Sequence, residues 1–275
     1  MLSRNRLLLF AVFLACSVAA FAKPTEGTLR FNLYRGYLVV VRGSAGPVKG
    51  LNFLLDTGTN PTMLDVGLAA KLHLDRTPAN VRVVGGNVQA ERAVAPKLAL
   101  GPVEKMNVPV FVADLSFFQQ ALPVPIDGVI GLDTLGDNPF LIDYDSREIH
   151  FGAFPVMPNS ISLGEAGGLA VVSAEVNNIP RRLLVDTGAS ALTLFAPSDG
   201  GAKNVKVSQP IGTFVHKDVT LHSLRLGTTD FGREQASVVT GEWQGYAFDG
   251  LVSPAMLGMR KVSFDLGRGV MGFSL

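Results

Sequence analysis

Short apolar or alternating runs, separated by turn residues, dominate the chain. Examples are "YLVVVRG" (37–43), "LNFLLD" (51–56), "NVPVFVAD" (107–114) and "RRLLVD" (181–186). Runs of four to eight residues bounded by Gly, Pro, Asn or Asp are typical of β-strands. The stretch with the clearest helical character is "DVGLAAKLHL" (65–74). The pattern therefore predicts a mostly β protein with one or two short helices.

The order of these runs occurs twice along the chain. "FLLDTGTNPTMLD" (53–65) is matched by "LLVDTGASALTLF" (183–195), which places Asp56 and Asp186 at 186 − 56 = 130 positions apart. Two further segments, 125–136 and 141–152, are echoed in the same order by 247–258 and 262–273. Three echoes in one order indicate a repeated unit of roughly 115–135 residues, which is an ordinary domain size.

The repeat divides the mature chain into two lobes. We assign residues 23–157 to an N-terminal lobe and residues 158–275 to a C-terminal lobe. The segment "GAFPVMPNSISLGEAGG" (152–168) is rich in Gly and Pro, and such composition predicts a connection between the lobes.

Residues 1–22 have the features of a cleaved secretory signal. Arg4 and Arg6 precede an apolar segment over 7–18, and "AFA" (20–22) supplies a cleavage site after Ala22. The apolar segment is short for a membrane span. Acylation of Cys16 is the alternative interpretation of this leader. We therefore expect a secreted or periplasmic protein.

The composition of the mature chain excludes several classes of partner. Removing residues 1–22 leaves 24 − 2 = 22 basic and 23 acidic residues, a formal charge of −1. This balance argues against nucleic acid or an anionic membrane surface as the partner. The four histidines show no metal-ligand spacing, so we predict no metal and no cofactor. Asp143 and Asp265, near Arg147 and Arg268, are interpreted as paired charges at turns.

The two Asp-Thr-Gly motifs carry the candidate chemistry. A single ionised Asp at the end of an apolar strand is costly to bury. If the repeat brings Asp56 and Asp186 together, the two carboxyl groups can share one proton over a wide pH range. The ionised member can then take a proton from water while the protonated member supports the developing oxyanion. This chemistry is suited to hydrolysis of an amide bond.

The residues that follow each Asp fit that arrangement. Gly58 and Gly188 allow a tight turn and a close approach of backbone amides. Thr57 and Thr187 carry hydroxyl groups that can hydrogen-bond across the axis between the lobes.

These motifs resemble those of the aspartic proteases. Each Asp-Thr-Gly segment is similar to the active-site loop of that family, and "DGVIG" (127–131) and "DGLVS" (249–253) are similar to the element behind the loop. The resemblance implies a catalytic dyad of Asp56 and Asp186, supported by Thr57, Gly58, Thr59, Thr187, Gly188 and Ala189. It also implies an all-β acid-protease fold, with two similar six- to eight-stranded β-barrel-like lobes and a cleft for an extended peptide.

The short lobes look more like fused copies of the retropepsin unit than like a pepsin. The resemblance places flaps over the cleft at "VVGGNVQ" (83–89) and "QPIGTFV" (209–215). The candidate flap residues are Gly85, Gly86, Asn87, Gly212 and Thr213.

The two loops differ at one position. Thr59 follows the first motif, whereas Ala189 follows the second. A hydroxyl that donates to a carboxylate favours its charged form, so we predict that Asp56 is the more readily ionised member. Thr59→Ala should accordingly raise the lower limb of the pH–rate profile.

The leading functional hypothesis is a secreted aspartic endopeptidase that acts on peptide or unfolded protein as a monomer, without a cofactor. One alternative is a catalytically weak or inactive relative that binds peptide or protein at the cell envelope. Another is a structural envelope protein that uses the lobes as a scaffold.

Overall fold

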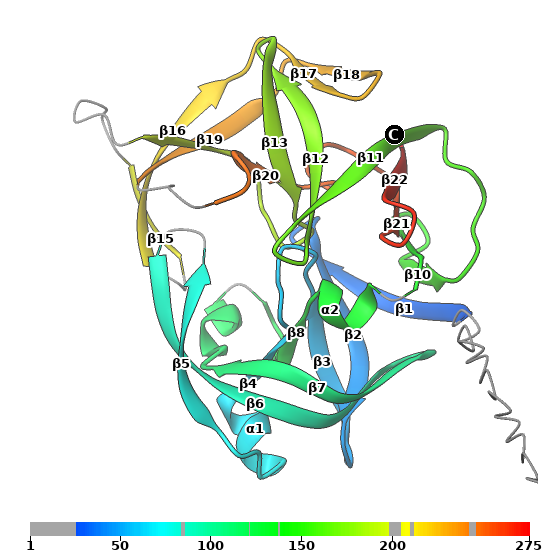
Figure 1. The fold of residues 1–275 in the computed structure, drawn as a ribbon, viewed down its shortest axis with the longest axis vertical. Coiled ribbons are helices and arrows are strands. Elements are labelled where there is room, and N and C mark those ends of the chain that lie inside the picture. Colours follow the sequence, from blue (N-terminus) through cyan, green and yellow to red (C-terminus); the bar gives the residue numbers. More distant parts are fainter. Residues whose placement is uncertain are drawn as a thin grey trace, which may run out of the picture.

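The computed structural model describes residues 26–83, 86–120, 122–136, 138–197, 205–209, 212–241 and 246–275, and these residues form an almost entirely β molecule (Figure 1). The N-terminal lobe contains β1 (Gly27–Tyr34), β2 (Leu38–Ala45), β3 (Val48–Leu55), β4 (Met63–Asp65), β5 (Thr77–Val83), β6 (Gly86–Leu100), β7 (Val103–Ala113), β8 (Gly128–Ile130), β9 (Phe140–Asp143) and β10 (Glu148–Phe151). Its helices are α1 (Val66–Lys71), a 3-10 turn over Ser116–Gln120 and α2 (Leu132–Leu135).

The C-terminal lobe follows the same plan. It contains β11 (Asn159–Ala166), β12 (Leu169–Val176), β13 (Ile179–Val185), β14 (Leu192–Pro197), β15 (Val205–Gln209), β16 (Gly212–Thr220), β17 (Leu224–Leu226), β18 (Thr229–Gly232), β19 (Gln235–Gly241), β20 (Gly250–Val252), β21 (Lys261–Asp265) and β22 (Val270–Ser274).

Each lobe has its own sheet, and a third sheet joins them. Strands β1–β8 form the first sheet and β11–β20 form the second. The third sheet is antiparallel in the order β1-β10-β9-β21-β22-β11, so β9 of the first lobe pairs directly with β21 of the second. The lobes are therefore connected by backbone hydrogen bonds as well as by the chain.

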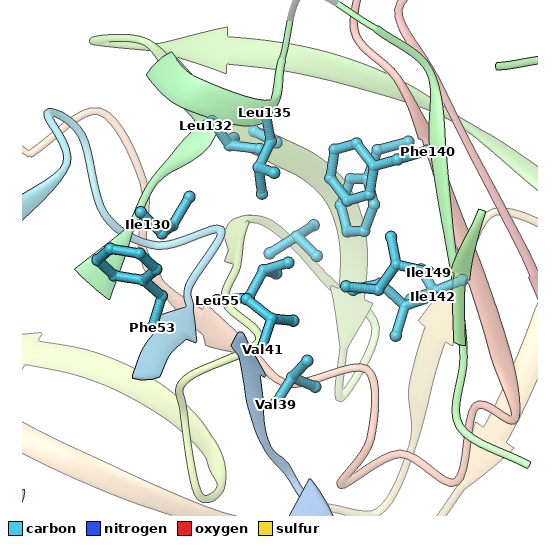
Figure 2. Packing of buried hydrophobic residues seen from close by; sticks show 14 of the residues in the cluster. Val39, Val41, Phe53, Leu55, Ile130, Leu132, Leu135, Phe140, Ile142 and Ile149 are labelled. Atoms are coloured by element: carbon cyan, nitrogen blue, oxygen red, sulfur yellow. The ribbon is translucent and has the colours of Figure 1, made fainter. Parts of the chain in front are cut away.

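Alternation along β3 shows why these sequences form strands with two buried faces. Phe53 and Leu55 point into the main core, together with Val41 of β2 and Ile130 of β8 (Figure 2). Leu54 points to the opposite face and packs in a second apolar cluster. The main core continues into the C-terminal lobe, where Phe264 of β21 stacks on Phe140 of β9 with ring centroids 4.9 Å apart.

The predicted helix near residue 65 is present as α1. The Asp65 side chain accepts a hydrogen bond from the Gly67 N–H at 2.8 Å, which satisfies one of the free amides at the helix start. Among the described residues, no helix is long and apolar enough to cross a lipid bilayer.

Two details of the predicted layout are corrected. Residues 159–166 of the expected connection form β11, because this segment finds partners in β12 and β22 that a local Gly and Pro count does not reveal. The described residues form ten strands in the first lobe and twelve in the second, where six to eight were expected in each. The second lobe has two more than the first because the long strands corresponding to β6 and β7 are interrupted, at 221–223 and 233–234. At the first break, the Asn177 side chain accepts the N–H groups of His222 and Ser223.

Candidate active site

Two equivalent loops lie at the ends of buried strands in the two lobes. Asp56 follows β3, which pairs in parallel with β8, and its N–H donates to the Ile130 carbonyl at 2.9 Å. Asp186 follows β13, which pairs in parallel with β20, and its N–H donates to the Val252 carbonyl at 2.9 Å. Residues 53–60 and 183–190 show the same order of buried, half-buried and exposed positions. The two sequence motifs therefore adopt the same local structure.

The loop backbone holds each carboxylate in place. The Gly58 N–H donates to Asp56 Oδ1 at 2.8 Å, and the Gly188 N–H donates to Asp186 Oδ1 at 2.8 Å. Only the first loop adds a side-chain donor, since the Thr59 hydroxyl donates to Asp56 Oδ2 at 2.8 Å.

Asp56 and Asp186 face each other across the boundary between the lobes. A Cβ atom added to Gly58 would lie 2.6 Å from Cγ of Asp186, and one added to Gly188 would lie 3.0 Å from Cγ of Asp56. Each glycine thus packs against the carboxyl group of the opposite loop. The structure brings together the two residues that the sequence assigned to the dyad, and it shows why no side chain fits at the third motif position.

A reciprocal clasp of threonines joins the two loops. The Thr57 hydroxyl donates to the Val185 carbonyl at 2.7 Å and accepts the Thr187 N–H at 3.1 Å. The Thr187 hydroxyl donates to the Leu55 carbonyl at 3.1 Å and accepts the Thr57 N–H at 3.1 Å. Both threonines are fully buried, so these four hydrogen bonds are shielded from water.

The electrostatics of the dyad are asymmetric. Withdrawal from solvent raises the pKa of Asp186 well above its usual value of 3.8, and the charge of Asp56 and a hydrogen bond between the two carboxyl groups raise it further. The N–H groups of Gly188 and Ala189 act in the opposite direction without cancelling the rise. The raised pKa keeps Asp186 protonated to a higher pH than an ordinary aspartic acid, as a dyad that shares one proton requires.

The Asp-Gly element behind each loop has a structural role that sequence reasoning did not identify. The Asp127 carboxylate accepts the Asn52 N–H at 2.8 Å, and the Asp249 carboxylate accepts the Arg182 N–H at 2.8 Å. In both lobes the Asp joins this element to the strand that ends at the Asp-Thr-Gly loop.

The predicted flap segments form hairpins. Val83 of β5 pairs with Gly86 of β6, and Gln209 of β15 pairs with Gly212 of β16. Asn87 and Thr213 lie in the returning strands, whereas Gly85 lies outside the described residues.

Apolar side chains form a second cluster in each lobe, around Leu54 and Leu184, which stand two residues before Asp56 and Asp186. On the Asp56 side, Leu54 packs with Val40 and Val129, with the half-buried Phe117 and Phe118 against them. On the Asp186 side, Leu184 packs with Val171 and Leu251, and three half-buried rings follow: Phe195, Tyr246 and Phe248, with centroids 5.7–5.9 Å apart.

A polar network under the first loop was also missed from the sequence. Thr62 and Asp133 are hydrogen-bonded to each other, whereas the matching positions of the second lobe are Leu192 and Ala255. Comparison of the two repeats at these positions is the signal that could have found it.

Comparisons with known proteins identify the class of fold. Residues 39–134 match a family model described as aspartyl protease. A solved structure of the aspartic proteinase from Irpex lacteus superposes with a TM-score of 0.55 at 13% identity, covering 90% of this chain and 97% of that one. Comparison with curated proteins gives no match. The fold is that of an aspartic proteinase, and the resemblance of this chain to the aspartic protease family is confirmed.

Proposed function

We propose that the protein is an aspartic-type endopeptidase that hydrolyses peptide bonds of extended polypeptides. The observation that carries this proposal is the close approach of Asp56 and Asp186, each packed against the glycine of the opposite loop. The raised pKa of Asp186 supports it, because such a dyad needs one protonated and one ionised member.

The proposed mechanism assigns one role to each carboxyl group. Asp56 accepts a proton from a water molecule between the two side chains as the water oxygen attacks the scissile carbonyl carbon. Asp186 donates its proton to the carbonyl oxygen, which gives a neutral tetrahedral diol. Asp56 then passes its proton to the amide nitrogen as the C–N bond breaks, and a diol hydroxyl returns a proton to Asp186.

The apolar clusters around Leu54 and Leu184, each two residues before an Asp of the dyad, support a preference for hydrophobic side chains on both sides of the scissile bond. The rings of Phe195, Tyr246 and Phe248 favour an aromatic or large aliphatic residue on the Asp186 side.

The test is cleavage of a denatured protein between pH 3 and 7, with and without a statine-type transition-state inhibitor. Asp56→Asn and Asp186→Asn should each abolish cleavage, whereas Asp114→Asn, a change at an exposed Asp that binds the Ser116 N–H, should retain it. Absence of cleavage at every pH would favour the alternative function of peptide binding without turnover.

We further propose that residues 1–22 direct export and are then removed. Intact mass and N-terminal sequencing of the exported protein should identify Lys23 as the first residue. An acylated Cys16 at the N-terminus would instead establish a lipid-anchored form.

Because one chain supplies both Asp residues, the active species should elute as a monomer.

A further inference from the structure

Thr62 is the centre of a saturated hydrogen-bond network below the first catalytic loop. Its side chain is fully buried, and its hydroxyl donates to Asp133 Oδ1 at 2.8 Å and accepts the Gly131 N–H at 3.0 Å. The Thr134 hydroxyl lies 2.8 Å away. A hydroxyl has one proton and two lone pairs, so Thr134 is the donor in that contact. The Thr62 N–H also donates to the Asp133 carboxylate at 3.0 Å.

The segment that follows β8, which begins with Gly131 and Leu132, also contacts Thr59, the residue whose hydroxyl donates to Asp56. The Leu132 N–H donates to the Thr59 carbonyl at 3.2 Å, and a Cβ added to Gly131 would collide with that carbonyl oxygen. The Thr59 hydroxyl in turn donates to Asp56 Oδ2. Contacts therefore run without interruption from Asp133 through Thr62 and Gly131 to Thr59, and from Thr59 to the dyad.

The second lobe lacks every polar member of this network. Ala189 stands at the position of Thr59, Leu192 at that of Thr62 and Ala255 at that of Asp133. Pro254 replaces Leu132 and has no N–H to donate to the Ala189 carbonyl. Ser253 replaces Gly131, and its buried hydroxyl has no hydrogen-bond partner among the described residues. Leu192 packs in the main core instead. The two loops thus have matching backbones but different supports.

We infer that Thr62 and Asp133 are positioning residues, which fix the Thr59 hydroxyl against Asp56 and so keep Asp56 as the proton-accepting member of the dyad. This inference rests on the proposed function and deepens it. A general structural role in the lobe would not require the network to end on a donor to a catalytic carboxylate. The absence of both that donor and the network from the second lobe points to a joint function.

The test is Thr62→Val, which keeps the side-chain shape and removes the hydroxyl. We expect the acidic limb of the kcat/KM profile to move up by about one pH unit, the effect of losing a hydrogen bond to a charged group. The value of kcat should fall about tenfold with KM nearly unchanged. Thr62→Ser keeps the hydroxyl, and Asp133→Asn keeps an acceptor oxygen at the position of Oδ1. Both variants should retain most of the wild-type profile. Asp114→Asn serves as the matched control.

A double mutant separates positioning from folding. In the Thr59→Ala background, Thr62→Val should move the acidic limb no further, because its effect is transmitted through Thr59. A lower melting temperature with an unchanged acidic limb would overturn the inference, as would additive shifts. Asp133→Ala provides the same comparison if Thr62→Val does not fold.

A second measurement keeps this test independent of turnover. The carboxyl ¹³C shifts of Asp56 and Asp186, followed by NMR across pH 2–8, report the titration of the dyad in each variant. If the wild type cleaves nothing, the proposed function fails while the inference is still decided by these titrations. An identical titration in wild type and Thr62→Val would reject it.

Discussion

At the scale of single residues, the dyad combines two identical side chains in different surroundings. Asp56 accepts hydrogen bonds from the Gly58 N–H and the Thr59 hydroxyl, whereas Asp186 accepts the Gly188 N–H and is followed by Ala189, which has no hydroxyl. A hydroxyl donor stabilises the charged form of a carboxyl group, whereas desolvation raises the pKa of Asp186 and favours its neutral form.

The raised pKa of Asp186 predicts a stability cost at neutral pH. Between the usual value of 3.8 and the raised folded value, the folded protein binds more protons at this site than the unfolded chain does, so stability falls as pH rises through that window. Asp186→Asn should therefore abolish activity and raise the melting temperature at pH 7, and the gain should disappear below about pH 4. Calorimetry at both pH values measures this. The exposed Asp230→Asn should show no such pH dependence, and a gain at pH 7 no larger than at pH 3 would contradict the prediction.

The glycine of the first motif should tolerate a methyl group less well than that of the second. The added Cβ of Gly58→Ala would lie 2.6 Å from Cγ of Asp186, whereas that of Gly188→Ala would lie 3.0 Å from Cγ of Asp56. Since 2.6 Å is too short for a carbon–carbon contact, the Asp186 carboxyl group must move away from the added methyl group. A shift of about 1 Å in a reacting group can reduce activity on the order of 100-fold. We expect that loss in kcat for Gly58→Ala and a smaller one for Gly188→Ala. Equal losses of kcat in the two variants would show that the contact of Gly58 with Asp186 is no tighter than that of Gly188 with Asp56.

At the scale of elements, the pairing of β9 with β21 is the connection that determines how the lobes join. Asp143 ends β9, and its buried carboxylate lies 2.8 Å from Nζ of Lys261 in β21. The sequence suggested Arg147 as its neighbour. Lys261 takes that place because strand register, which is a long-range property, puts it opposite Asp143. Asp265 does lie near Arg268, at 3.9 Å.

This ion pair predicts acid sensitivity of the joining sheet. Burial alone would raise the pKa of Asp143, but the hydrogen bond and charge of Lys261, with the N–H groups of Ser146 and Asp145, lower it below 3.8. Its contribution to stability is therefore present above pH 3.8 and is lost as pH falls through the lowered folded value. Asp143→Asn should lower the free energy of unfolding by about 2 kcal/mol at pH 7 and by less at pH 2.

Chemical denaturation at the two pH values checks this expectation. Asp265→Asn is the matched control from the other half, because Arg268 is 84% exposed and such pairs contribute about 0.5 kcal/mol or less. Equal losses of unfolding free energy in the two variants would show that the Asp143–Lys261 ion pair contributes no more to stability than the exposed Asp265–Arg268 pair.

At the scale of the whole molecule, three structures hold the dyad together: the six-stranded sheet, the shared core and the threonine clasp. The clasp is closest to the dyad, since Thr57 and Thr187 directly follow Asp56 and Asp186. Each of its hydroxyl groups bridges the lobes, because it donates to a carbonyl of the opposite lobe and accepts an N–H from it.

Removal of one clasp hydroxyl should affect stability and activity together. Thr187→Val leaves the Leu55 carbonyl and the Thr57 N–H without their buried partners. Each unsatisfied group costs about 1–3 kcal/mol, so we expect a loss of about 2–4 kcal/mol in unfolding free energy together with a lower kcat. Thr187→Ser should restore both, and full activity in Thr187→Val would show that the loops are aligned without the clasp.

The strands around the site could be predicted locally, whereas several connections could not. Short apolar runs bounded by turn residues identify β2, β3 and β13, because strands buried on both faces need apolar side chains at consecutive positions. The same reasoning assigned 159–166 to a linker, since the partners that make it a strand lie in β12 and β22. Similarly, Thr62 and Asp133 are 71 positions apart, and no local pattern connects them.

The sequence by itself determined the β-rich composition, the two repeated motifs and therefore the identity of Asp56 and Asp186. It could do so because strand periodicity and a repeated Asp-Thr-Gly are written in consecutive residues. Only the tertiary structure decided which hydroxyl reaches which carbonyl, that Lys261 pairs with Asp143, and that desolvation raises the pKa of Asp186. Those outcomes depend on distances and desolvation, which arise when segments far apart in the chain pack against one another.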